Sequence, residues 1–290
     1  MFRGSIVALV TPFLSSGELD TETIERLSLL HADSGTDGIL VAGCTGESFT
    51  LKDDERLMLL NTVASAVGGK IPVIVGTGAS STSVAVRRTK AAMDAGADGA
   101  LVITPFGNKP SQHAMETYFN EVADVGLPVI LYNVPGRTGS CISPETATGL
   151  FEHPNIFAIK EASGSLDAVS RIIRDSDLTV LSGDDSLTLP MISLGASGVI
   201  STVANLLPAD FADMVHFALD GDFAKAAELH LKMFPVMKAL FIEGNPVPLK
   251  AAMEYAGIIP GANLRPPLSP MNDANRRKLI EILDEYGVGE

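Results

Sequence analysis

A lysine at the end of an apolar segment has the most distinctive chemistry in this sequence. Lys160 follows directly on Ile156-Phe157-Ala158-Ile159. A fully buried lysine is rare, and removal from water favours its neutral amine, which can attack a carbonyl carbon and form an imine. The alternatives are a salt bridge to a carboxylate such as Glu161 and a side chain that extends outward to solvent. Spacing alone does not separate these alternatives.

Two further side chains could take part in chemistry beside such an amine. Tyr132 ends the apolar segment 128–132, so its hydroxyl could relay protons. The alternative is a core tyrosine whose hydroxyl is satisfied by a hydrogen bond. Cys44 has no histidine near it in the sequence, so we do not expect it to act as a nucleophile.

Two features could bind an anion such as a carboxylate. The segment Gly43-Cys44-Thr45-Gly46-Glu47-Ser48 combines glycines, hydroxyl groups and backbone N–H groups before a predicted helix, which suits an anion cradle. It is equally compatible with a tight turn in which Ser and Thr cap the helix. Arg137, after Pro135-Gly136, could bind a carboxylate through two hydrogen bonds or form a surface ion pair.

The sequence gives no support to a metal cofactor. Its five histidines, at positions 31, 113, 153, 216 and 230, have no metal-ligand spacing, and it contains neither a CxxC nor an HExxH motif. We therefore expect any catalysis to depend on organic functional groups.

Short apolar segments alternate with helical segments along most of the chain and predict the elements that position these residues. The apolar segments span residues 5–10, 38–42, 72–76, 100–103, 128–132, 156–160, 179–182 and 198–201. Eight such units predict an α/β fold, a (β/α)8 TIM barrel over residues 1–222. An open doubly wound sheet is the competitor, but Gly76-Thr77-Gly78 is followed by Ser81 where its third glycine would stand.

The last quarter of the chain follows a different pattern. Only helices are expected after Gly221, over residues 223–243, 247–256 and 273–286, so residues 223–290 form a C-terminal helical extension.

In the barrel, Ser80 and Ser143 are expected to cap helices, with Pro144 at the first helical position. Active sites of such barrels lie at the carboxyl ends of the strands, where Tyr132, Lys160 and the Gly43–Ser48 loop all fall.

Composition narrows the possible partners and location. The net charge is −14 and the pI is near 4.7, so the field of the protein repels nucleic acid and anionic membranes. No apolar run approaches the length of a membrane span. The two cysteines, Cys44 and Cys141, are far apart and no secretory signal pattern is present, so we expect a reducing cytoplasm.

Five motifs together resemble the dihydrodipicolinate synthase family of class I pyruvate lyases. They are Gly4-Ser5-Ile6-Val7-Ala8-Leu9-Val10-Thr11-Pro12, the Gly43–Ser48 loop, Tyr132-Asn133-Val134-Pro135-Gly136-Arg137-Thr138-Gly139, Ile159-Lys160-Glu161-Ala162 and Leu181-Ser182-Gly183-Asp184-Asp185. The resemblance spans the whole chain. It implies condensation of pyruvate with L-aspartate 4-semialdehyde to 4-hydroxy-tetrahydrodipicolinate, in diaminopimelate and lysine biosynthesis, by a homotetramer made of two dimers.

The resemblance also implies roles for individual residues. Lys160 would form the imine with pyruvate, which is why no separate cofactor is expected, and Tyr132 would relay protons. Thr45 and the neighbouring backbone would hold the carboxylate of pyruvate, and Arg137 that of the semialdehyde. Two residues would shape the pocket, namely Gly183 and Ile200.

Two positions depart from the family pattern. Cys44 stands where the family has Thr, and Gly107 stands where it has a Tyr that reaches a neighbouring subunit's site, so the Tyr-Thr-Tyr proton relay is incomplete. A thiol can still carry a weak hydrogen bond at position 44.

Positions expected to bind lysine in feedback inhibition are also altered, which predicts weak or absent inhibition. They hold Ser80, Val84 and Phe106, with Asp53 and Arg56 nearby.

Two other functions fit parts of the same pattern. One is a related pyruvate-dependent aldolase of the sialic-acid lyase or 2-keto-3-deoxy sugar-acid type, which would share the lysine and tyrosine and is consistent with Gly107. The other is a non-catalytic protein that binds keto acids. Retention of Lys160, Tyr132 and Arg137 argues against the second, since binding alone needs no imine-forming amine.

Overall fold

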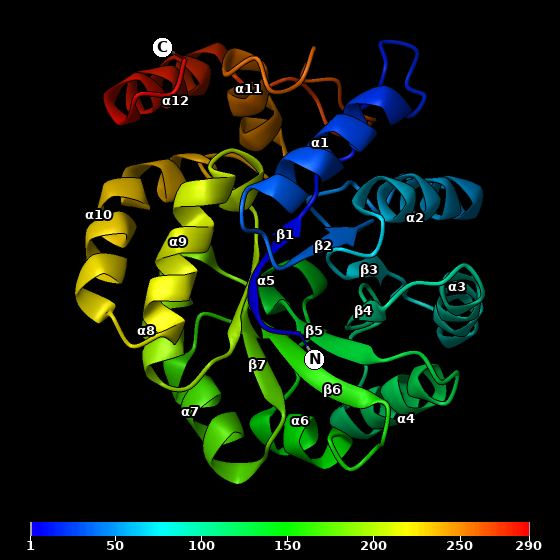
Figure 1. The fold of residues 1–290 in the computed structure, drawn as a ribbon. Coiled ribbons are helices and arrows are strands. Elements are labelled where there is room, and N and C mark those ends of the chain that lie inside the picture. The colour runs from blue at the N-terminus through cyan, green and yellow to red at the C-terminus, as the bar shows by residue number, and fades with distance from the viewer. Residues whose placement is uncertain (1, 290) are drawn as a thin grey trace.

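The protein forms a closed parallel barrel surrounded by helices (Figure 1), seen in a computed structural model that describes residues 2–289. Each strand pairs in parallel with the next, and β1 pairs with β8 to close the barrel. The strands are β1 Gly4–Ala8, β2 Gly38–Val41, β3 Val73–Gly76, β4 Gly99–Ile103, β5 Val129–Asn133, β6 Ile156–Glu161, β7 Thr179–Ser182 and β8 Gly198–Ser201. The predicted (β/α)8 barrel is confirmed.

Helices follow the strands and cover the outside of the barrel (Figure 1). The α-helices of this part are α1 Thr21–Asp33, α2 Asp53–Val67, α3 Thr82–Asp94, α4 Gln112–Ala123, α5 Pro135–Thr138, α6 Pro144–Leu150, α7 Leu166–Asp175, α8 Thr188–Ser193 and α9 Pro208–Leu219. Two short 3-10 helices, η1 Asp185–Leu187 and η2 Val203–Asn205, follow β7 and β8. The short helix α5, directly after β5, had no counterpart among the expected elements.

Helix capping agrees with the sequence at one serine and corrects it at another. Ser143 caps α6, because its side chain accepts a hydrogen bond from Thr146 N and Pro144 occupies the first turn. The cap of α3 is Ser81 rather than Ser80, so the expectation for Ser80 was wrong. Residue type does not distinguish Ser80 from Ser81, because serine is favoured as a helix cap at either position. The helix begins after Ser81, whose backbone is extended (φ −117°, ψ 129°).

Three helices make up the rest of the described chain: α10 Phe223–Ala239, α11 Val247–Tyr255 and α12 Asp273–Tyr286. Helix α10 lies alongside α9 (Figure 1). It ends at Ala239 rather than at the expected Glu243. Two residues of the segment between α10 and α11, Phe241 and Asn245, line a cavity together with residues at the strand ends. No helix in the described range is long and apolar enough to cross a membrane.

The apolar core has two parts that follow the two faces of the strands. Successive side chains of a strand point to opposite faces, so Ile130 and Tyr132 fall in the cluster inside the barrel, whereas Leu131 falls in the cluster between barrel and helices. The outer cluster also includes Met233 and Val236 of α10. The helical extension therefore shares its apolar core with the barrel.

Candidate active site

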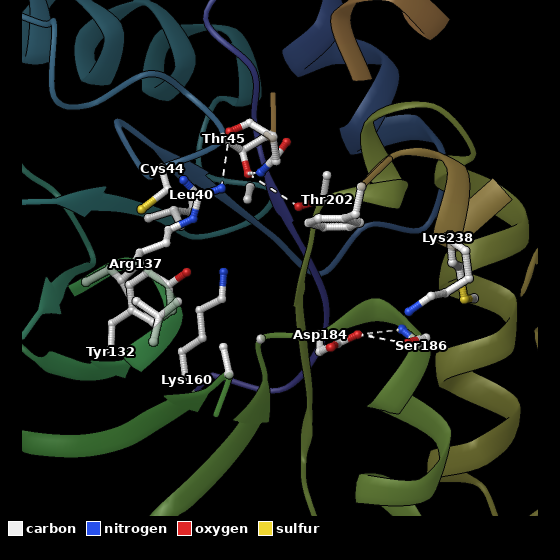
Figure 2. A pocket seen from close by; sticks show the side chains of 18 residues that line it. Leu40, Cys44, Thr45, Tyr132, Arg137, Lys160, Asp184, Ser186, Thr202 and Lys238 are labelled. Carbon is white, nitrogen blue, oxygen red and sulfur yellow. Dashed lines mark hydrogen bonds between the residues drawn. The ribbon is translucent and has the colours of Figure 1, made fainter. Parts of the chain in front are cut away.

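The strand ends surround a cavity of about 260 Å³ (Figure 2). Six of the seven residues predicted from sequence line it: Cys44, Thr45, Tyr132, Arg137, Lys160 and Gly183. The seventh, Ile200 in β8, is buried in the apolar cluster inside the barrel and is not among the cavity-lining residues. Side chains that are up to about 140 residues apart in the chain thus meet at one place, as expected for the carboxyl ends of barrel strands.

Strand alternation directs Lys160 into the barrel. Ala158 lies in the inner cluster and Ile159 in the outer one, so Lys160 returns to the inner face of β6. It is directly opposite Tyr132 of β5 in the strand register, and its Nζ lies 4.7 Å from the centre of the tyrosine ring. Figure 2 shows the side chain rising into the cavity.

Burial controls the charge of this amine. Lys160 is 5% exposed, and the loss of hydration lowers its pKa from 10.5 to about 8. The neighbouring carboxylate Glu161 is engaged elsewhere, because it accepts hydrogen bonds from Asn133 Nδ2 at 2.8 Å and from Ser163 N at 2.6 Å. Neither a salt bridge to Glu161 nor an outward-pointing side chain describes Lys160.

Tyr132 and Cys44 lie beside each other in the cavity wall next to the amine. Tyr132 is buried and Cys44 is half-buried in the cavity wall. Loss of hydration raises the pKa of the Tyr132 hydroxyl well above 10.0 and also raises the pKa of the Cys44 thiol. Both therefore carry their protons at neutral pH. A protonated thiol is a poor nucleophile, so the arrangement suits Cys44 for hydrogen bonding rather than for attack on a substrate.

Hydroxyl, amide and guanidinium groups lie on another side of the cavity. Thr45 Oγ1 lies 3.3 Å from Thr202 Oγ1 and accepts a hydrogen bond from Asn245 Nδ2 at 2.9 Å. Arg137, in α5, donates from Nη2 to the backbone oxygen of Asn245 at 3.1 Å. Within the described chain Arg137 forms no ion pair, so its charge is available to an anion in the cavity.

Gly183 is required by the close approach of two strand ends. A Cβ atom at this position would lie 2.6 Å from Ala162 Cβ and 3.1 Å from Lys160 Cε. Any other residue would push against the aliphatic part of the lysine. The glycine thus keeps space for Lys160 and for a molecule bound to its amine.

The model of the dihydrodipicolinate synthetase family matches residues 1–286. The chain belongs to this family. A relative described as 4-hydroxy-tetrahydrodipicolinate synthase, from Pelobacter propionicus, is 45% identical over 291 residues, covering 99% of this chain and all of the relative. Among solved structures, dihydrodipicolinate synthase from Aquifex aeolicus is 43% identical with a TM-score of 0.97, covering 99% of both chains. The enzyme from Cyanidioschyzon merolae with lysine bound is 40% identical with a TM-score of 0.96, also covering 99% of both.

The two departures from the pattern of the dihydrodipicolinate synthetase family have different surroundings. Cys44 replaces a hydroxyl with a thiol inside the cavity wall. Gly107 lies on an exposed loop with φ of +81°, and a Cβ atom there would meet nothing within 4 Å.

Two of the residues at the expected lysine-binding positions already contact other side chains. Asp53 accepts hydrogen bonds from Arg88 Nε at 2.7 Å and Arg87 Nη2 at 3.0 Å. Phe106 packs edge to face against Phe49, with ring centres 5.0 Å apart.

The nearby Arg56 is likewise occupied. It is buried, and its guanidinium donates to the backbone oxygens of Gly76 and Ser48. The backbone oxygen of Ser80 accepts a hydrogen bond from Asn108 Nδ2 at 2.9 Å. The side chain of Val84 in α3 has no polar group that could bind a ligand.

Several cavity residues escaped the sequence analysis because they come from the helical extension. Met237, Lys238, Phe241 and Asn245 line the same cavity as Lys160. Asn245 also has a buried side-chain oxygen without a hydrogen-bond partner in the described structure. The sequence predicts only that Asn245 lies in a turn, because Gly244 and Pro246 flank it. It does not predict which cavity the side chain faces.

Asp185, the last residue of the motif Leu181–Asp185, has structural contacts that the sequence did not predict. It is buried, and burial raises its pKa to about 6. Its carboxylate accepts hydrogen bonds from the backbone N–H groups of Thr202 and Val203 at 3.2 and 3.1 Å. It thereby connects the loops that follow β7 and β8.

The described residues contain no group of three or more His, Cys, Asp or Glu side chains that could hold a metal ion.

Proposed function

We propose that this chain is a 4-hydroxy-tetrahydrodipicolinate synthase, a Schiff-base-forming lyase that condenses pyruvate with L-aspartate 4-semialdehyde in lysine biosynthesis. The observation that carries the proposal is a buried lysine with a pKa near 8 in a cavity that also holds a tyrosine, an arginine and a threonine. Membership of the dihydrodipicolinate synthetase family and the function named for its relatives support the same reaction.

The first half of the proposed reaction attaches pyruvate to Lys160. The neutral amine attacks the C2 carbonyl of pyruvate, and loss of water from the resulting carbinolamine leaves an imine. Thr45 and nearby backbone N–H groups bind the pyruvate carboxylate. Tyr132 donates a proton to the departing hydroxyl and exchanges that proton with the thiol of Cys44 beside it.

The second half forms the new carbon–carbon bond. Loss of a proton from C3 of the imine gives an enamine, whose C3 attacks the aldehyde carbon of the semialdehyde. Arg137 binds the carboxylate of this second substrate. The amino group of the semialdehyde then attacks C2, closes the ring and displaces the Lys160 amine, so the enzyme is regenerated and no separate cofactor is consumed.

We further propose that the enzyme is a cytoplasmic homotetramer made of two dimers. Cys44 and Cys141 are both free, as expected in a reducing compartment. Helix α10 carries two large apolar side chains in exposed positions, Leu231 at 69% and Phe234 at 42%, which supports self-association. Sedimentation should give a mass about four times the 30.4 kDa of one chain, and a monomer at micromolar concentration would contradict the tetramer.

Borohydride trapping tests the central proposal. Incubation with pyruvate and borohydride should reduce the imine to a stable adduct on the peptide that contains Lys160, and Lys160→Ala should abolish this adduct. Absence of an adduct in the unaltered protein would favour a non-catalytic binding protein. An adduct combined with cleavage of keto-deoxy sugar acids and no consumption of aspartate 4-semialdehyde would instead establish the related aldolase activity.

A further inference from the structure

The helical extension holds the loop of residues 43–48 through a buried ion pair. Lys250 of α11 and Glu47 are 0% and 1% exposed in their side chains, and Lys250 Nζ lies 2.5 Å from Glu47 Oε1. The two residues are 203 positions apart in the sequence. A buried pair is held only when further hydrogen bonds satisfy both charges.

Those further hydrogen bonds also come from the extension. Glu47 Oε2 accepts from the backbone N–H of Arg265 at 3.0 Å, and Lys250 Nζ donates a second hydrogen bond to the backbone oxygen of Asn263 at 2.7 Å. The Lys250 ammonium also lies 4.4 Å from the centre of the Phe13 ring. The carboxylate of Glu47 is therefore fixed from two directions by groups that the barrel itself does not supply.

Glu47 has a backbone conformation that this fixation supports. Its φ is +54°, in the left-handed region that residues other than glycine seldom adopt. Thr50 Oγ1 donates to its backbone oxygen at 3.1 Å, and its own N–H donates to the oxygen of Cys44 at 3.1 Å. The turn at Glu47 thus sets the direction of the two preceding residues, which include Thr45.

The same segment of the extension contacts the loop a second time. Asn245 donates to Thr45 Oγ1 at 2.9 Å, and the N–H of Lys250 donates to the oxygen of Pro246 within the first turn of α11. Two residues near the start of α11 therefore hold the loop: Asn245 contacts Thr45, and Lys250 contacts Glu47. A displacement of Lys250 would move both contacts.

We infer that Glu47 and Lys250 are positioning residues, which set the Thr45 hydroxyl and the loop N–H groups at the place where the carboxylate of pyruvate binds. The inference rests on the proposed function, since it takes Thr45 as a pyruvate-binding residue. The pair has no contact with Lys160. Its loss should therefore weaken pyruvate binding and leave the chemistry of the amine unchanged.

The test compares Glu47→Gln, Lys250→Met and the double variant Glu47→Gln/Lys250→Met. Each is expected to raise the KM for pyruvate at least tenfold, with kcat changed less than threefold. The pH midpoint of borohydride trapping is expected to stay near 8. Because the ion pair is the contact that the two residues share, the double variant should raise KM by less than the product of the two single effects.

A matched control removes another ion pair from the same helix. Arg276 lies 3.5 Å from Glu254 of α11, and both side chains are about 40% exposed. Arg276→Met should leave the KM for pyruvate within twofold of the unaltered protein. If it raised KM as much as Lys250→Met, general loosening of α11 would explain the result and the inference would be overturned.

Stability is measured alongside to separate positioning from folding. A lower Tm with an unchanged KM for pyruvate in Glu47→Gln, which keeps the shape of the side chain, would also overturn the inference. The result for Glu47→Gln decides the question if Lys250→Met does not fold. Absence of a pyruvate adduct in the unaltered protein would overturn the proposed function itself, and this inference with it.

Discussion

At the scale of single residues, the environment of one amine sets the pH range in which it can react. A lysine with its ordinary pKa of 10.5 would be almost wholly charged at pH 7, whereas the burial of Lys160 lowers its pKa to about 8. Roughly a tenth of the protein then carries the neutral nucleophile at pH 7. Desolvation thus increases the reactive fraction by more than two orders of magnitude.

The rate of imine formation should therefore rise with pH and level off above about pH 8. Burial lowers the pKa of this cationic group, so the charged, unreactive form dominates below pH 8 and the neutral form above it. Single-turnover borohydride trapping with pyruvate at pH 6 to 10 measures the profile. A midpoint near 10.5 would show that the amine is not desolvated in solution.

The thiol of Cys44 should make a weaker proton relay than a hydroxyl in the same place. Cys44→Thr should raise kcat about threefold to tenfold, because a hydroxyl is a stronger donor and acceptor than a thiol. Cys44→Ala should lower kcat, since Tyr132 then loses the neighbouring group with which it exchanges a proton. Equal kcat values for Cys44→Ala and the unaltered protein would show that position 44 takes no part in the relay.

At the scale of elements, the ends of β6 and β7 lie so close that the residue after β7 must be glycine. Gly183→Ala would place a Cβ atom 2.6 Å from Ala162 Cβ, so we expect a loss of stability of about 1–3 kcal/mol. Pressure on Lys160 Cε should also lower kcat/KM at least tenfold. Chemical denaturation and steady-state kinetics measure the two effects.

Gly149→Ala is the matched control for this substitution. Gly149 lies within α6, where a Cβ atom would meet nothing within 4 Å. Alanine there should leave kinetics unchanged and stabilise the helix by about 0.5–1 kcal/mol. Equal kinetic losses from both alanines would contradict a specific role for the contact between Gly183 and Lys160.

Contacts between α2 and α3 occupy a residue that was expected to bind lysine in feedback inhibition. The charge of Asp53 is already paired with Arg87 and Arg88, and Phe106 packs against Phe49. We therefore expect lysine to inhibit weakly or not at all, in contrast to what the lysine-bound relative would suggest. Steady-state assays with added lysine test this, and clear inhibition at sub-millimolar lysine would refute it.

At the scale of the whole molecule, we propose that the barrel and the helical extension unfold together. They share one apolar core, to which α10 contributes Met233 and Val236, and they are joined by the buried pair of Glu47 and Lys250. Thermal unfolding should show a single transition with coincident fluorescence and circular dichroism signals. Two separated transitions would show that residues 223–290 form an independent unit.

The sequence by itself determined the barrel and the chemistry of its strand ends. Eight apolar segments with regular spacing leave few arrangements other than a closed parallel sheet. The carboxyl ends of parallel strands meet at one mouth, so the strand pattern alone places Lys160, Tyr132 and the Gly43–Ser48 loop together. Strand alternation is local, and it is enough to direct Lys160 inward.

The tertiary structure decided everything that depends on contacts between distant segments. The lowered pKa of Lys160 depends on burial by the whole barrel mouth, and the role of Glu161 beside it follows from its bonds to Asn133 and Ser163. Asn245 contacts Thr45 and Lys250 contacts Glu47 because the extension packs against the barrel. No local sequence pattern indicates either contact. Residues about 200 positions from the loop they hold carry no signal of that contact in their own sequence neighbourhood.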